Sequence, residues 1–318
     1  NTYYDGPFSS EYLVHKGDLL VGMDGEFNIA RWKSQDALLN QRVCKIVANS
    51  NVDEEYLRFY LKRALKDIEN KTSFVTVKHL SAKKLSNLVI KLPKKNIQIS
   101  ISKQLSFLES LIHNFNEENV LFDELVKARF VEMFGDIISN DKNWNSKPLK
   151  ELCDISRGAS PRPISDYLGG TIPWIKIGDA TIGDSIYINS TKEHIIKEGV
   201  RKSRFIKKGS LIFANCGVSL GFCRIINFDG CIHDGWLAFQ NIDTSLNKIF
   251  LLTTINQMTG YFRKIAPGGT QPNLNTDIVG NYIQVVPPLE LQNQFADFVK
   301  EVDKSRFIIK SMIKEGLL

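Results

Sequence analysis

Apolar residues recur every three or four positions along two long, otherwise polar stretches of this 318-residue chain. This spacing places an apolar stripe along one face of a helix, and its persistence over many turns indicates a coiled-coil seam. Neither stretch contains a proline that would break a helix. The seam positions are Ile101, Leu105, Leu108, Ile112, Phe115, Asn119, Phe122, Val126, Arg129 and Met133 in the first stretch, and Phe295, Val299, Val302, Arg306, Ile309 and Ile313 in the second.

The two seams keep the same phase when the sequence is shifted by 194 residues, so we expect the two helices to pack on each other. Asn119, Arg129 and Arg306 interrupt the seams, and we expect them to set the register. An alternative is that each helix packs separately on its own domain. The residues expected at helix and subunit contacts are Leu105, Leu108, Ile112, Phe115, Phe122, Phe295, Val299, Val302 and Ile309.

The segments ahead of the two helices also repeat. A shift of 192 places KGDLLVGMDG, residues 16–25, on KGSLIFANCG, residues 208–217. A shift of 194 places VIKLP, residues 89–93, on IQVVP, residues 283–287, and Gln98 on Gln292. Each copy predicts a Lys-Gly turn, two strands, a helix, a polar turn, a short strand and a proline before the long helix. The helix before the polar turn is EEYLRFYLKRAL in the first copy and NKIFLLTTINQMTGYFRKI in the second.

The second copy opens with PLKELCDISRGASPRP, for which the first copy has no counterpart. Subtracting 194 from the number of Trp144 places the corresponding start about 50 residues before Asn1. The first copy is therefore expected to be truncated at its N-terminus.

These patterns together predict an α+β protein with a pseudo-twofold internal repeat, in which two globular domains are joined by two long antiparallel coiled-coil helices. We expect a first domain over residues 1–96, a helix over 97–137, a second domain over 138–288 and a second helix over 289–318. The polar linker SNDKNWNSK, residues 139–147, opens the second domain.

The distribution of charge suggests a partner. The formal net charge is +6. From Lys71 to Lys95 there are seven lysines and no Asp or Glu, and five of the eight residues from Arg201 to Lys208 are basic. Such patches favour a polyanion, because each neutralised phosphate releases condensed counterions. One patch alone is more typical of a solvated surface, so DNA binding needs support from a second feature.

The chain shows no recognisable catalytic or metal-binding motif. It lacks a GxxxxGK[ST] loop, a GxGxxG after a strand, an Asn-Pro-Pro-aromatic signature, HExxH and GxSxG. Its five cysteines form no CxxC pair, so we expect reduced thiols, no metal and no cofactor. His233 and Asp234 could form an acid–base pair, but neighbours in a strand point to opposite faces, which favours structural roles. No apolar run is long enough for a membrane helix, and we expect a cytoplasmic, non-catalytic protein.

Two polar loops occupy equivalent places in the two copies. SFVTVKHLS, residues 73–81, falls on PGGTQPNLN, residues 267–275. Asn and Gln side chains can bond adenine edges, Lys and Arg can bond guanine, and glycine lets a backbone approach a duplex. An ordinary turn is the alternative for either loop alone. Two equivalent polar loops beside lysine-rich segments favour DNA. The basic loop RGASPR, residues 157–162, is a further candidate.

The residues KGDLLVGMDGEFNIARW, ALLNQRVCKI, LVKARFVEMFGD, and GGTQPNLN followed by IQVVPPLELQNQF resemble the specificity (S) subunits of type I restriction–modification systems. The resemblance covers nearly the whole chain. It implies that residues 1–96 and 138–288 are target-recognition domains, each contacting one half of a bipartite double-stranded DNA site. It further implies that the helices dock methyltransferase (M) subunits, that restriction (R) subunits join them, and that the chain has no catalytic centre.

The expected DNA contacts lie in the three polar and basic loops. They are Thr76, Lys78, His79, Arg157, Ser160, Arg162, Gly269, Thr270, Gln271 and Asn273. The alternative function is a helical scaffold that assembles protein partners without binding DNA. The two hypotheses differ in one measurable respect, because only the first predicts salt-dependent DNA affinity.

Overall fold

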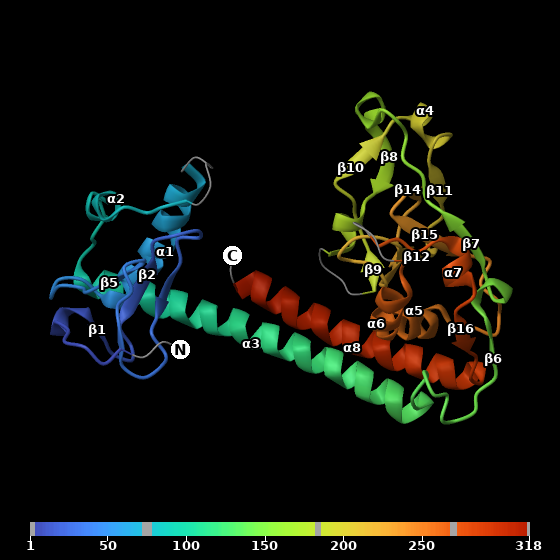
Figure 1. Cartoon of the computed structure of the whole chain (residues 1–318), viewed down its shortest axis with the longest axis horizontal. Helices are drawn as coiled ribbons and strands as arrows, with labels where there is room; N and C mark the ends of the chain where they lie inside the picture. Colours follow the sequence, from blue (N-terminus) through green and yellow to red (C-terminus); the bar gives the residue numbers. More distant parts are fainter. Residues whose placement is uncertain (1–3, 72–77, 182–185, 268–271, 317–318) are drawn as a thin grey trace. The chain divides into compact units, whose positions relative to one another are not determined.

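The computed structural model describes residues 4–71, 78–181, 186–267 and 272–316. The chain divides into two compact units (Figure 1). Unit 1 comprises residues 1–117 and 312–318, and unit 2 comprises residues 118–311. Helix α3, Lys95–Phe134, begins in unit 1 and ends in unit 2. Its 40 residues span about 60 Å at 1.5 Å per residue.

Unit 1 is built on an antiparallel sheet of strand order β3-β2-β5, with one helix packed on it. Leu57, Leu61 and Leu65 recur every four residues along that helix, so they share one face and enclose a core with Val21 and Phe27. The elements of unit 1 ahead of α3 are a 3₁₀ turn Ser10–Tyr12, β1 Leu13–Val14, β2 Leu19–Gly22, β3 Ile29–Arg31, β4 Ala37–Leu38, β5 Val43–Ile46, α1 Glu54–Lys71 and α2 Ala82–Ser86.

Ion pairs fasten α1 to the first part of α3 within unit 1. The Glu109 carboxylate on α3 accepts hydrogen bonds from Arg58 at 2.6 Å and from Lys62 at 2.9 Å. The hydrogen bond from Arg58 is the main cause that lowers the pKa of Glu109 to about 2. The charge that holds the two helices together is therefore present over the whole neutral range.

Unit 2 is a sandwich of two sheets with helices on one side. The five-stranded sheet has the order β7-β15-β12-β13-β9, and the four-stranded sheet has the order β10-β8-β14-β11. Alternate residues of β12 face opposite ways: Phe213 enters a core shared with the helices, while Ile212 and Ala214 enter the core between the sheets. Both faces of the five-stranded sheet are therefore buried, which explains the uninterrupted apolar run of β12.

Many short strands and several helices make up unit 2. They are β6 Ser146–Pro148, β7 Asp154–Arg157, β8 Leu168–Ile175, β9 Tyr187–Ile188, β10 Glu193–Ile195, α4 Lys197–Val200, β11 Arg204–Ile206, β12 Leu211–Ala214, β13 Cys223–Ile226, β14 Gly230–Ile232, β15 Trp236–Gln240, α5 Lys248–Gln257, α6 Thr259–Ile265, α7 Thr276–Gly280, β16 Ile283–Val285 and α8 Leu289–Gly316, with 3₁₀ turns at Leu149–Glu151, Ile164–Tyr167 and Ile177–Thr181.

Within unit 2, α8 runs antiparallel to the second part of α3, and the two helices lie side by side (Figure 1). Near the start of α8, the Phe295 ring lies 5.4 Å from that of Phe130 and 5.5 Å from that of Phe134. Further along α8, Arg306 Nη2 lies 2.6 Å from Asp123 Oδ1. An aromatic cluster and an ion pair thus fix the two helices at separate points along their contact.

The seam residues differ in how deeply they lie. Phe295, Val299 and Val302 are buried, and the Phe122 ring lies 5.5 Å from the Arg306 guanidinium. Leu105, Leu108, Phe115 and Ile309 are half-buried, and Ile112 is exposed. In α3 the deepest residues, Phe130 and Phe134, lie one position beyond the expected Arg129 and Met133. The reason is that these two rings also pack on Phe250 of α5. The side of α3 that is buried is therefore determined by the domain core as well as by α8.

The predicted α+β fold and internal repeat are confirmed. A shift of 192 places β2 on β12, and Gly17 and Gly209 at the turns before them both have positive φ, at 101° and 82°. Each central strand lies between two antiparallel neighbours: β2 between β3 and β5, and β12 between β13 and β15.

Two details of the expected repeat are wrong. The single helix expected from residue 247 to 265 is divided into α5 and α6 at Met258. The Thr259 hydroxyl donates to the Gly221 carbonyl there, beside the break. The short strand expected at VIKLP, residues 89–93, is not a strand. Its counterpart β16 is paired with β6, and among the described residues of unit 1 no strand corresponds to β6.

Candidate nucleic-acid interface

The two polar loops are attached to their central strands in the same way. In unit 2, Asn273 forms an isolated antiparallel bridge with Cys216, just beyond the end of β12. In unit 1, His79 forms the same bridge with Asp24, just beyond β2. Shifts of 192 and 194 place Asp24 on Cys216 and His79 on Asn273. Each loop is thus held at the same end of its sheet.

A buried leucine anchors each loop directly after the bridge. The Leu274 amide donates to the Asn215 carbonyl at 2.8 Å, and the Leu80 amide donates to the Met23 carbonyl at 2.7 Å. Both leucine side chains are fully buried. The buried leucine therefore fixes the position of the polar residue that precedes it, His79 in unit 1 and Asn273 in unit 2, at the end of the sheet.

In unit 1 the bridge carries a cluster of charged side chains. His79 Nδ1 lies 2.5 Å from Asp24 Oδ1, and Arg42 Nε lies 3.3 Å from Asp24 Oδ2. The His79 side chain is 64% exposed and that of Arg42 is 69% exposed, so both can reach a ligand in solvent. Lys78 Nζ lies 3.8 Å from Glu69 on α1. Thr76 lies outside the described residues. Arg42 is a member of this cluster that sequence reasoning missed.

In unit 2, three predicted residues of the RGASPR loop gather around Asp234. The Ser160 hydroxyl donates to Asp234 Oδ1 at 2.7 Å, and Arg162 Nη2 lies 3.5 Å from Oδ2. Arg157 Nε donates to the Asp234 carbonyl at 3.2 Å. Burial opposes ionisation of Asp234, but the hydrogen bond from Ser160 and the nearby positive charges outweigh it and lower its pKa. Asp234 therefore holds the basic loop in place as a carboxylate.

His233 also contacts Asp234, contrary to the expectation that the two side chains point to opposite faces. His233 Nε2 lies 2.9 Å from Asp234 Oδ1, because both residues follow the end of β14 and lie in a turn. The Gly235 amide donates to His233 Nδ1 at 2.9 Å. The Asp234 carboxylate accepts a hydrogen bond from Ser160 and also contacts His233. These contacts support a structural role for the His233–Asp234 pair.

The RGASPR loop and the polar loop of unit 2 meet at the end of β12. The Asn215 amide donates to the Gly235 carbonyl at 3.0 Å, while the Asn215 carbonyl accepts from Leu274. Asn273 is exposed beside this junction. Gly269, Thr270 and Gln271 lie outside the described residues. The chain therefore brings Asn273 and the loop at 157–162, which are more than a hundred positions apart in sequence, to one end of the sheet.

A further arginine extends the basic surface of unit 2. Arg204 on β11 donates from Nε to the Arg157 carbonyl at 3.2 Å, so the patch RKSRFIKK reaches the RGASPR loop. Lys207 of the same patch is instead paired with Asp229 at 2.9 Å. The basic stretch at residues 201–208 and the RGASPR loop at residues 157–162 thus form one surface around Arg157, Arg162 and Arg204.

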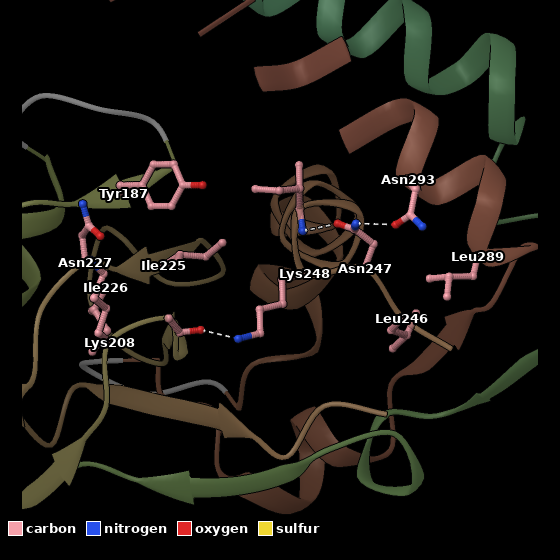
Figure 2. A pocket seen from close by; sticks show the side chains of 12 residues that line it. Tyr187, Lys208, Ile225, Ile226, Asn227, Leu246, Asn247, Lys248, Leu289 and Asn293 are labelled. Carbon is pink, nitrogen blue, oxygen red and sulfur yellow. Dashed lines mark hydrogen bonds between the residues drawn. The ribbon is translucent and has the colours of Figure 1, made fainter. Parts of the chain in front are cut away.

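The pocket drawn in Figure 2 lies elsewhere in unit 2 and has a volume of about 510 Å³. It is lined by Tyr187 of β9, the turn before β12, β13 and the residue after it, and the segments at the start of α5 and α8, and it includes none of the expected DNA contacts. Lys248 donates to the Gly209 carbonyl at 2.7 Å, and Asn247 donates to Asn293 at 2.8 Å (Figure 2).

Unit 1 fills the place equivalent to this pocket with ion pairs. Arg31 donates to the Gly17 carbonyl at 2.7 Å and lies 2.9 Å from Glu54 and 2.6 Å from Glu55. A shift of 194 places Arg31 on Ile225, so unit 2 has a shorter apolar side chain where unit 1 has a guanidinium. The pocket is thus a local difference between the copies, and we assign it no role in DNA contact.

The described residues contain no group of three His, Cys, Asp or Glu side chains placed to hold a metal ion. Over the same residues, every helix is too short or too polar to cross a bilayer.

Comparison with known proteins identifies the family. A family model described as the type I restriction modification DNA specificity domain matches residues 3–121 and again residues 141–318. The EcoBI specificity subunit of Escherichia coli is 43% identical over 157 residues, which cover 47% of this chain and 33% of that protein. The MjaVIII specificity subunit of Methanocaldococcus jannaschii is 22% identical over 320 residues, covering 93% of this chain and 74% of that protein.

A solved structure shows the same fold. The S subunit of a type I restriction–modification system from M. genitalium aligns with a TM-score of 0.61 at 16% identity, covering 96% of this chain and 80% of that one. The match to the E. coli relative spans only about a third of that protein's length. The two matches of the family model coincide with the two copies of the internal repeat. The chain belongs to the family of type I restriction modification DNA specificity domains, and it contains two of them.

Proposed function

We propose that this chain recognises double-stranded DNA for a type I restriction–modification complex, and that each unit reads one half of a bipartite site. The observation that carries the proposal is the equivalence of the two bridges, Asp24–His79 and Cys216–Asn273. Two domains of one specificity family each present polar residues at the equivalent end of their own sheet.

The chemistry of the two surfaces suits base edges and phosphates. In unit 2, exposed Asn273 can bond an adenine edge, and Arg157, Arg162 and Arg204 can contact guanines or phosphates. In unit 1, His79 and Arg42 take the equivalent place beside Lys78. Because the two equivalent bridge positions carry different side chains, Asn273 in unit 2 and His79 in unit 1, the two half-sites are expected to differ in sequence.

Partner subunits complete the proposed function. Methyltransferase subunits would dock on α3 and α8, and restriction subunits would join the assembly. Both helices carry large apolar side chains that are exposed, among them Phe107, Leu121 and Leu125 on α3 and Phe307 on α8. Methyl transfer and cleavage would belong to the partners, which fits the relatives' description as specificity subunits. The assembly would act on DNA in the cytoplasm.

The test is to mix the chain with its methyltransferase partner and map the methylated adenines. Asn273→Ala should relax the preference at one base position of one half-site, by about 1–3 kcal/mol, because it removes a base contact. Arg162→Ala should instead weaken binding to all sequences alike and reduce the slope of log affinity against log salt by about 1, because it removes a phosphate contact.

Asn145→Ala is the matched control, because Asn145 is an exposed asparagine just before β6, outside both long helices and outside the loops proposed to contact DNA. It should leave both half-sites unchanged. An unchanged sequence preference in Asn273→Ala would remove that residue from the interface. Absence of any salt-dependent DNA affinity in the complex would reject the proposed function itself.

A further inference from the structure

The hairpin that joins β12 to β13 is longer than its counterpart in unit 1. Residues 215–222 connect β12 to β13, whereas residues 23–28 connect β2 to β3, so the hairpin of unit 2 has two more residues. Leu19 pairs with Arg31 and Leu211 pairs with Ile225, which places the change of shift from 192 to 194 within this hairpin. The added length lies at the end of the sheet that carries the Cys216–Asn273 bridge.

Val218 lies in the middle of this hairpin, and its side chain is 95% exposed. A single exposed apolar side chain is common on protein surfaces and indicates nothing by itself. The position of Val218 distinguishes it, because it follows by two residues Cys216, whose bridge partner Asn273 is an expected base contact. An apolar side chain is therefore presented at the same end of the sheet as the polar and basic loops of unit 2.

The backbone of the hairpin is fixed to the rest of unit 2. Arg263 on α6 donates from Nη2 to the Val218 carbonyl at 2.9 Å and from Nε to the Leu220 carbonyl at 3.3 Å. The Leu220 side chain is buried, and the Gly221 amide donates to the Ala214 carbonyl at 2.9 Å. Because the backbone is already held, little conformational freedom is lost when the Val218 side chain contacts a ligand.

The side chain that holds the hairpin is basic and exposed. Arg263 and its neighbour Lys264 both reach solvent on α6. An apolar tip next to exposed basic residues suits a DNA groove, where phosphates attract the basic residues and the base edges include one apolar group. That group is the 5-methyl of thymine, which is displayed in the major groove.

Unit 1 carries a different chemistry at the equivalent place. A shift of 192 places Glu26 on Val218, and the Glu26 side chain is exposed. A carboxylate accepts hydrogen bonds, for example from the amino group of cytosine, and it gains nothing from a methyl group. A methyl contact by this hairpin is therefore expected in one half-site only.

We propose that Val218 contacts the 5-methyl group of a thymine in the half-site that unit 2 reads. This inference rests on the proposed function and adds an apolar base contact to the polar ones. Val218 would distinguish thymine from cytosine by burying the methyl group, while Asn273 on the bridged loop would bond a nearby base.

The experiment removes the methyl group from the DNA. The complex of the full chain with its methyltransferase partner is titrated with duplexes in which one thymine at a time is replaced by deoxyuridine. Affinity is measured by fluorescence anisotropy, because a replacement opposite a methylated adenine can alter methyl transfer without altering binding. One replacement should weaken binding about fourfold, as expected for one buried methyl group. It should lie in the half-site whose preference Asn273→Ala changes.

Val218→Ala should remove the same contact from the protein side. It should weaken binding to the thymine duplex about fourfold and reduce the difference between thymine and deoxyuridine to less than about twofold, because the two changes act on one contact. Val47→Ala is the matched control and should keep the full difference. Val47 is 75% exposed and follows β5, at the opposite end of its sheet from the Asp24–His79 bridge.

The possible outcomes separate this contact from the proposed function. Specific binding that no deoxyuridine weakens, or a deoxyuridine effect that Val218→Ala leaves unchanged, would overturn the contact and leave the proposed function intact. A sensitive thymine in the other half-site, or a unit 2 half-site without thymine on either strand, would overturn it too. Failure of Val218→Ala to assemble with the methyltransferase would show that a protein partner covers Val218. A wild-type complex without sequence-specific binding would reject the proposed function and the contact together.

Discussion

Two buried glutamines show how closely the copies agree at the scale of single residues. Gln98 is 1% exposed and Gln292 is 0% exposed. Gln292 Oε1 accepts from the Asn247 amide at 2.9 Å, and its Nε2 donates to the carbonyls of Ser245 at 2.9 Å and Pro287 at 2.7 Å.

Gln98 makes the same three hydrogen bonds one repeat earlier. It accepts from the Asp53 amide at 2.9 Å and donates to the carbonyls of Asn51 at 3.2 Å and Pro93 at 2.8 Å. The glutamine therefore ties the start of α3 to the loop before α1 in the first copy, and the start of α8 to the loop before α5 in the second. A shift of 194 relates all four residues of this arrangement.

Replacing Gln292 by alanine should destabilise unit 2 by about 2–3 kcal/mol, because it leaves a buried amide and two buried carbonyls without partners. Urea unfolding followed by the fluorescence of Trp174 and Trp236, both buried in unit 2, would measure the loss. Gln294→Ala is the control, since Gln294 is exposed on the same helix. Equal effects of the two substitutions would show that the hydrogen bonds of Gln292 add nothing.

The sequence predicted some of these residues and not others, for physical reasons. The sequence showed that Gln98 matches Gln292 in the repeat. It did not predict that both are buried, because glutamine side chains are mostly exposed in proteins. The arginines and serine of RGASPR were predicted as DNA contacts because their loop is polar and basic, and the structure places them together around Asp234. Their common partner Asp234 was missed, because the alternation argument for strands does not hold in the turn after β14.

At the scale of elements, the contact between α3 and α8 depends on an aromatic cluster. Phe130, Phe134, Phe250 and Phe295 are all fully buried, and they come from α3, α5 and α8. The heptad pattern predicted the helices and their pairing in unit 2. It placed the seam at Arg129 and Met133, whereas the buried residues are Phe130 and Phe134. The heptad pattern describes contacts between the two long helices only, and these two rings also pack on Phe250 of α5. The internal repeat, for its part, predicted a strand at residues 89–93 that is not formed, because sequence pattern does not reveal whether a partner strand is present.

Phe295→Ala should destabilise unit 2 by about 3–5 kcal/mol, because it opens a cavity that the rigid neighbours fill only in part. Phe307→Ala, on the same helix and 69% exposed, should change stability by less than about 0.5 kcal/mol. Paired urea titrations of the two variants provide the measurement. A small loss for Phe295→Ala would show that α8 can leave α3 without cost to the core.

At the scale of the whole molecule, the two units have unequal cores. Among the described residues, the core cluster of unit 1 contains six buried apolar residues, while the main core cluster of unit 2 contains several times as many. All four residues of β5 are half-buried, whereas four of the five residues of β15 are fully buried. Stability rises with the apolar area removed from water, so the copies should differ in stability although they share a fold.

Unit 1 should therefore unfold at a lower urea concentration than unit 2 in the same chain. Hydrogen exchange at increasing urea should show amides of β2, β5 and α1 losing protection before those of β12, β15 and α5. The two glutamines assign the transitions: Gln98→Ala should move only the first, and Gln292→Ala only the second, because distant substitutions act independently. A single transition that both substitutions move equally would show that α3 couples the units into one cooperative structure.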